Sequence, residues 1–173
     1  MIKTYYLLCF LVSGIFLLLT ILIPLLIDKA GFANTINDLF GIICHQIPER
    51  SLFIFGNPMP LCIRCFGMAV GTFAACCIGV LLTPIGQFFD RCMAYFHMSG
   101  EEMMKYLVII LLILMIPMMA DGFIQLISNY ESTNLIRLIT GIMFGYARGV
   151  LLSSACLTII LYLKKIRVEK IKG

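Results

Sequence analysis

Hydrophobic positions along the chain fall into four long stretches separated by polar segments. The stretches run from about Tyr5 to Ile27, Leu61 to Leu82, Tyr106 to Ile127 and Leu135 to Leu163. Each reaches the roughly 20 apolar residues that carry an α-helix across a bilayer. We therefore predict an all-α polytopic membrane protein with four transmembrane helices, forming one transmembrane domain over residues 1–173.

Composition supports this interpretation and removes several classes of protein. Hydrophobic residues make up 61% of the chain and charged residues 13%, against about 45–50% and about 25% in soluble domains. These values exclude a soluble globular domain, a disordered chain and a basic nucleic-acid-binding module. The expected surroundings are therefore the lipid bilayer, and no nucleic acid is expected as a partner.

Charge around the stretches predicts the orientation in a cell membrane. Lys164, Lys165 and Arg167 follow the last stretch directly, and Lys/Arg residues favour the cytoplasmic side. With four crossings, both termini are then cytoplasmic. The connections Asp28–Pro60 and Ser128–Asn134 face outward.

Two of the predicted helices carry rows of small residues at intervals of about four. The row in the second helix contains Gly67, Gly71 and Gly79, and the row in the fourth contains Gly141, Gly145 and Gly149. Small residues at this interval let two helices approach closely inside a membrane. We expect these two helices to pack side by side and parallel.

Polar side chains in the predicted helices indicate a pocket between the second, third and fourth. An arginine inside a membrane costs at least about 2.5–3.5 kcal/mol unless it is paired or reaches the surface. A structural and a functional role are about equally expected for Arg148, the deepest charge. Arginines with few acids suit an anionic lipid or a small anion. The residues expected in the pocket are Arg64, Asp121, Gln125, Glu131, Arg137 and Arg148.

The long outward connection is expected to be structured. A short helix is predicted from Asn34 or Thr35 to Phe40, because apolar residues there lie on one helical face. The sequence Phe55-Gly56-Asn57-Pro58 is typical of a tight turn. The turn would bring the two ends of this connection together.

Cysteines in and just after this connection indicate a candidate metal-binding site. Cys44 and His45 precede a Cys-x-x-Cys sequence formed by Cys62 and Cys65. Three thiols and one imidazole form a set that zinc accepts in tetrahedral geometry. A transition-metal site, most simply zinc, is the first hypothesis, with no reaction assigned and enzymatic activity left open.

Two alternatives remain for the same cysteines. Cys62 and Cys65 lie at a predicted helix N-terminus beside Arg64, where thiol pKa values fall. A four-helix membrane protein with an outward Cys-x-x-Cys resembles the quinone-linked thiol oxidases, which implies a thiol–disulfide oxidoreductase and a quinone cofactor. That class has a second cysteine pair, and Ser128–Asn134 contains none. The other alternative is a structural disulfide or inert thiols.

Sequence motifs resemble an uncharacterised prokaryotic membrane family, a domain of unknown function. They are CHQIPERS, PLCIRCFG, DGFIQ, ESTNLIR and TGIMFG. Phe66 departs from the threonine expected there. The resemblance implies four membrane spans but no reaction or substrate. By this resemblance the motif positions are Cys44, His45, Pro48, Arg50, Ser51, Cys62, Arg64, Cys65, Gly67, Asp121, Gly122, Gln125, Arg137, Thr140 and Gly141.

Overall fold

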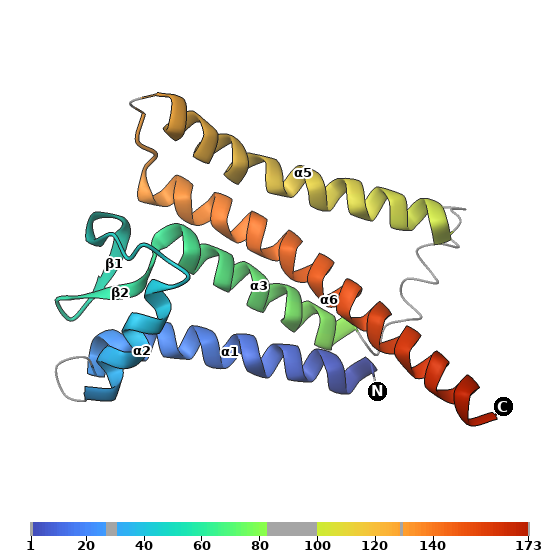
Figure 1. Cartoon of the computed structure of the whole chain (residues 1–173). Coiled ribbons are helices and arrows are strands. Elements are labelled where there is room, and N and C mark those ends of the chain that lie inside the picture. Colours follow the sequence, from blue (N-terminus) through green and yellow to red (C-terminus); the bar gives the residue numbers. More distant parts are fainter. Residues whose placement is uncertain (1, 27–30, 83–99, 129, 173) are drawn as a thin grey trace.

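Four long helices dominate the computed structural model, which describes residues 2–26, 31–82, 100–128 and 130–172 (Figure 1). The predicted residue Ile27 and most of the connection between the second and third spans lie outside the described residues. The long helices are α1 (Ile2–Leu26), α3 (Ile63–Leu82), α5 (Gly100–Ile127) and α6 (Asn134–Lys172). All four are long and apolar enough to cross a membrane, which confirms the predicted fold class.

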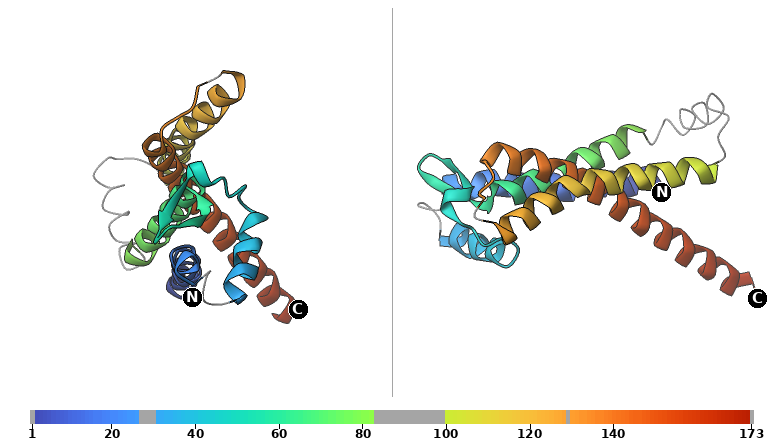
Figure 2. Two further views of the ribbon diagram at one scale, coloured as in Figure 1. Left: turned by 90° about the vertical axis from the view of Figure 1, so that its left-hand side faces the viewer. Right: turned by 90° about the horizontal axis from the view of Figure 1, so that it is seen from above.

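The helices lie in the order α1, α3, α6, α5, and each packs against the next (Figure 1). Helix α5 is the outermost and contacts mainly α6, as the views in Figure 2 also show. Both chain termini lie at one end of the bundle. The short elements between α1 and α3 lie at the other end, which we call the hairpin end.

Glycines bring α3 and α6 into backbone contact. A Cβ atom added to Gly67 would lie 2.7 Å from the carbonyl oxygen of Leu138, and one added to Gly141 would lie 2.5 Å from that of Arg64. Gly71, Gly145 and Gly149 likewise leave no room for a Cβ against the facing helix. Because lipid solvates apolar side chains as well as protein does, this close approach supplies the packing energy.

Gly79 does not share this interface. A Cβ atom there would lie 2.5 Å from the Tyr6 ring of α1. The prediction that Gly79 faces the fourth span is therefore wrong. Two turns below Gly71, the row has drifted around α3 toward α1, as a 3.6-residue helix requires of positions spaced by four.

The connection between the first two spans contains a helix and a β-hairpin. Its elements are α2 (Gly31–Gly41), the 3₁₀ turn η1 (Pro48–Arg50), β1 (Ser51–Ile54) and β2 (Asn57–Cys62). The strands are antiparallel, and Gly56 closes the turn with φ +87°. Helix α2 begins three residues before the predicted start. Helix α3 begins two residues later than predicted because Pro58 and Pro60 favour extended backbone within β2.

Apolar contacts and hydrogen bonds hold this connection on the bundle. Ile23, Phe40, Cys44 and Leu61 form one buried cluster that joins α1, α2 and β2. The Gln46 amide nitrogen donates to the carbonyl oxygens of Asn37 at 2.8 Å and Pro60 at 3.1 Å. The segment that carries Cys44 is thus fixed against β2.

Candidate functional site

Three cysteines meet at the hairpin end. The Sγ atoms of Cys44, Cys62 and Cys65 all lie within 4.8 Å of one another. Cys44 follows α2, Cys62 ends β2, and Cys65 lies in the first turn of α3. All three thiols are free, so the structure brings them together without a disulfide. We refer to them as the thiol cluster.

Local structure accounts for this meeting. The hairpin pairs Ser51 with Cys62, which places Cys62 at the start of α3, three residues before Cys65. Burial of Cys44 in the apolar cluster directs its sulfur to the same point, where it accepts a hydrogen bond from the Cys62 backbone N–H at 3.2 Å. The cluster therefore depends on the contact of α2 with β2.

Electrostatics favour a thiolate at Cys62. A hydrogen bond from the Cys65 side chain lowers the pKa of Cys62 most, and hydrogen bonds from the Cys65 backbone, the Cys44 side chain and the Arg64 backbone lower it further. Partial burial opposes this effect, and the resulting pKa is about 5. This lowered pKa favours the thiolate form of Cys62, which is the form required of a metal ligand or a nucleophile.

His45 lies near the cluster but outside the group of converging ligand atoms. Its side chain is exposed and lines the same cavity as the three cysteines, whereas only the three sulfurs lie within 4.8 Å of one another. The structure therefore brings together three of the four predicted metal ligands and leaves the imidazole at the edge.

The thiol cluster opens into a cavity of about 330 Å³. We call it the arginine pocket, because three arginines and no acidic residue are among the described residues that line it. Its lining consists of Ile43, Cys44, His45, Ile47, Arg50, Cys62, Arg64, Cys65 and Arg137. The three thiols and the three arginines thus line one shared cavity.

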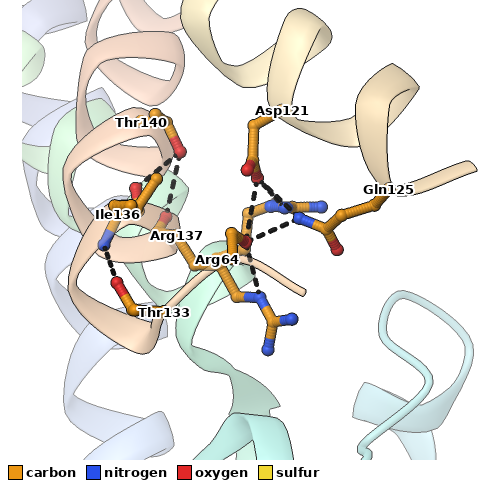
Figure 3. Close-up of polar contacts among 8 residues, drawn as sticks. Arg64, Asp121, Gln125, Thr133, Ile136, Arg137 and Thr140 are labelled. Carbon is orange, nitrogen blue, oxygen red and sulfur yellow. Dashed lines mark hydrogen bonds and ion pairs between the residues drawn. The ribbon is translucent and has the colours of Figure 1, made fainter. Parts of the chain in front are cut away.

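A buried polar network forms one wall of this pocket and joins α3, α5 and α6 (Figure 3). Arg64 forms an ion pair with Asp121. Gln125 donates to the same carboxylate oxygen at 2.9 Å and to the Ser132 hydroxyl at 2.6 Å. Ser132 donates to Asp121 at 3.2 Å and accepts from the Arg137 Nε at 3.0 Å. Arg64 and Arg137 are therefore held by one carboxylate, the second through a hydroxyl.

Glu131 lies apart from this network. It forms an exposed ion pair with Arg50 at 3.0 Å, and its side chain is 75% accessible. Arg50 lines the pocket, whereas Glu131 does not. The structure thus places Glu131 on the rim, as the partner of a pocket residue.

Arg148 lies in a different cavity. This second cavity of about 480 Å³ lies between α1, α3 and α6 and is lined mainly by apolar side chains, including Leu8, Val12 and Phe16. Within it the Arg148 guanidinium donates to the Thr72 hydroxyl at 3.1 Å. The other predicted pocket arginines, Arg64 and Arg137, do not line this cavity.

Three residues of the arginine pocket, its polar network and the second cavity were not predicted from the residue types along the chain; they are Arg50, Ser132 and Thr72. Arg50 entered only through the family resemblance, and no sequence signal pointed to Ser132 or Thr72. Small hydroxyl residues are common in membrane helices and loops, so neither stands out along the chain. Their role as hydrogen-bond partners of Arg137 and Arg148 follows from position in space alone.

Comparisons with other proteins agree with the resemblance seen in the motifs. Residues 44–151 match the family model described as "Predicted membrane protein (DUF2085)". The chain is 36% identical over 151 residues to the uncharacterized protein MJ1492 of Methanocaldococcus jannaschii, covering 83% of this chain and 87% of that protein. It is also 33% identical over 115 residues to an uncharacterized protein of Methanothermobacter thermautotrophicus, covering 65% of this chain and 86% of that protein. No solved structure matches. The matched region contains the thiol cluster and the three arginines of the arginine pocket. The chain belongs to the DUF2085 family of predicted membrane proteins.

Proposed function

We propose that the protein is a membrane metalloprotein that binds one zinc ion through Cys44, Cys62 and Cys65. The observation that carries this proposal is the mutual approach of three unbonded sulfurs within 4.8 Å. Tetrahedral zinc with bonds of about 2.3 Å needs sulfurs about 3.5–4 Å apart, so a small contraction of the cluster suffices. A thiolate at Cys62 supplies one deprotonated ligand before the ion arrives.

The fourth ligand decides between two forms of this site. His45 would complete a closed shell, which is typical of structural zinc. With His45 remaining at the edge, the fourth position would face the arginine pocket, as in zinc sites that bind water or a substrate. The exposed position of His45 favours the open form.

Metal content of the purified full-length protein tests the proposal. We expect one zinc per chain, lost in Cys44→Ser and Cys62→Ser. Cys77→Ser is the matched control, because this free thiol lies far along α3 from the cluster. Retention of zinc by His45→Ala would support the open form. Zinc-free wild-type protein, purified without chelators, would contradict the proposal.

A thiol–disulfide oxidoreductase, with a quinone as electron acceptor, is the second candidate. The pKa of Cys62, about 5, favours it, because a thiolate next to a second thiol is the reactive form in disulfide exchange. Against it, the other cysteines whose side chains the structure describes lie inside the spans and form no second outward pair; they are Cys9, Cys76 and Cys77. Denatured, unreduced protein would expose all eight thiols under the metal proposal and two fewer if Cys62 and Cys65 had been oxidised.

For the orientation, we propose cytoplasmic termini and an outward hairpin end in the cell membrane. The Lys/Arg residues after the fourth span support it. The test uses cysteines introduced at exposed positions, Phe55→Cys and Thr4→Cys, in a variant whose native cysteines do not label. A membrane-impermeant maleimide should label Phe55→Cys in intact cells and Thr4→Cys only after permeabilisation. The reverse result would contradict this orientation.

A further inference from the structure

Arg137 is the least satisfied charge in the described part of the arginine pocket. Its side chain is only 5% exposed. The Nε atom donates to Ser132, whereas the buried Nη2 atom has no hydrogen-bond partner among the described residues. Buried donors in native proteins are nearly always paired, and each exception needs an explanation. A missing ligand is one such explanation.

The ion pairs of the three pocket arginines indicate that this ligand is negatively charged. Asp121 forms an ion pair with Arg64, and Glu131 forms one with Arg50. Among the described residues, Arg137 has no carboxylate within ion-pair distance. It reaches Asp121 only through the Ser132 hydroxyl. The pocket wall therefore has an excess positive charge, and no acidic residue is among the described residues that line the cavity.

The shape of the donors indicates the class of anion. Guanidinium groups present planar pairs of N–H donors that match the oxygens of phosphate and carboxylate groups. Arg64 also has a buried Nε atom without a partner in the described structure. Its bond to Asp121 holds the guanidinium in place. Two fixed guanidinium groups beside a cavity of about 330 Å³ suit a group of phosphate size.

We infer that the arginine pocket binds a phosphate-type oxyanion through Arg137 and Arg64. The arginine contacts stand on their own. The further statement that an oxygen of this anion occupies the open metal position rests on the proposed function. Cys44, Cys62 and Cys65 line the same cavity as both arginines, so one anion can approach both groups.

The depth of Arg64 and Arg137 in the membrane is compatible with a phosphate group from either of two sources, a lipid headgroup or the surrounding water. Arg64 is the second residue of the α3 span and Arg137 the fourth of the α6 span. Both arginines therefore lie near the ends of their spans, at the level of the lipid headgroups and within reach of ions from water. Basic pockets between transmembrane helices at this depth bind lipid headgroups. A phosphate on a lipid and a free phosphate therefore present the same group to the pocket.

The experiment uses the full-length protein with its metal content measured in parallel. One arm titrates inorganic phosphate into detergent-solubilised protein. The other compares nanodiscs of phosphatidylcholine with nanodiscs that contain phosphatidic acid. We expect saturable stabilisation against thermal unfolding in at least one arm. Stabilisation by free phosphate identifies a small anion, and stabilisation only by phosphatidic acid identifies a lipid headgroup.

Variants connect the effect to the residue. Arg137→Gln should weaken phosphate affinity at least about tenfold, as expected for a lost charged hydrogen bond. Arg137→Lys keeps the charge without the planar pair of donors and should lie between wild type and Arg137→Gln. Arg148→Gln is the matched control, because that arginine lines the other cavity, and it should bind as wild type does.

Three results would separate a failure of the anion inference from a failure of the zinc proposal. Wild-type protein that contains zinc and responds to neither probe removes the anion site and leaves the metal proposal intact. Arg137→Gln or Arg137→Lys protein that binds phosphate as tightly as wild type also removes it. Phosphate binding by a zinc-free wild-type protein would contradict the proposed function and retain the arginine site.

Discussion

Helix α6 packs against its two neighbours by different physical means. Toward α3 it presents Gly141, Gly145 and Gly149, and the two backbones touch. Toward α5 the specific contacts are polar and lie at the hairpin end, where Asp121 and Gln125 of α5 bind Ser132 in the segment before α6. Ser132 in turn accepts a hydrogen bond from Arg137 of α6. Close backbone packing and buried polar bonds are two ways to associate helices in lipid, which offers no hydrophobic driving force.

The exposed surface of α5 illustrates the difference. Ile113 and Met119 are both more than half exposed, and Gly122 has nothing within 4 Å of an added Cβ. Leu111 is the buried apolar residue among the described side chains of α5. The helix therefore depends on a few localised contacts, whereas α3 and α6 share a row of them. Substitutions should affect the two interfaces in different ways.

Gly145→Leu is expected to have the largest effect. A Cβ atom at this position would overlap backbone atoms of Met68, which cannot rotate away as a side chain can. We expect the free energy of unfolding to fall by more than about 3 kcal/mol, at or beyond the usual upper cost of overpacking. Unfolding in detergent or bicelles measures it. Gly122→Leu, the same change on α5, should cost under about 0.5 kcal/mol, and equal costs would show that α3 and α6 are not in tight contact.

Asp121→Asn should give the largest effect at the α5 interface. The carboxylate binds Arg64 directly and Arg137 through Ser132, so its loss leaves buried positive charge without a partner. Breaking a buried ion pair in this way costs about 3–5 kcal/mol. Glu131→Gln breaks the exposed pair with Arg50 and should cost about 0–1 kcal/mol. Similar losses in the two variants would mean that the network does not hold α5 in place.

Gly79→Ala should have an intermediate effect that depends on α1. The added Cβ meets the Tyr6 ring at 2.5 Å, and a side chain can move where a backbone cannot. We expect a loss of about 1–3 kcal/mol. The Gly79→Ala/Tyr6→Ala double variant should recover part of this loss, which a double-mutant cycle measures. An additive cycle would place Gly79 against another element.

Gln125→Ala should have the smallest effect of the four. It removes two hydrogen bonds, to Asp121 and Ser132, and leaves the ion pair in place. Hydrogen bonds between membrane helices contribute about 0.6–1.7 kcal/mol, and we expect a loss within this range. The control is Leu126→Ala, next in sequence and 83% exposed. If this control costs as much, α5 gains no specific stability from Gln125.

The features of this protein that depend on length and local spacing could be predicted from the chain alone. Four spans follow from apolar length measured against bilayer thickness, and an even number of spans places both termini at one end. Motifs in sequence order were enough to indicate the family. The Cys62-x-x-Cys65 spacing lets two sulfurs converge where β2 passes into α3, so part of the thiol cluster could be predicted as well.

Which groups meet follows from the packing of the folded chain. The sequence placed Asp121, Arg64 and Arg137 in one expected pocket, and the fold pairs Asp121 directly with Arg64. Sequence reasoning grouped Arg148 with these residues, yet α6 carries it about 16 Å beyond Arg137, at about 1.5 Å per residue, to the Thr72 hydroxyl. It also predicted that Gly79 of α3 faces α6, whereas the rotation along α3 turns this position toward Tyr6 of α1. The depth of a residue in the membrane and the direction of its side chain both change with each residue along a helix. Over many residues these changes add up, so the packing of the whole bundle determines which partner a side chain meets.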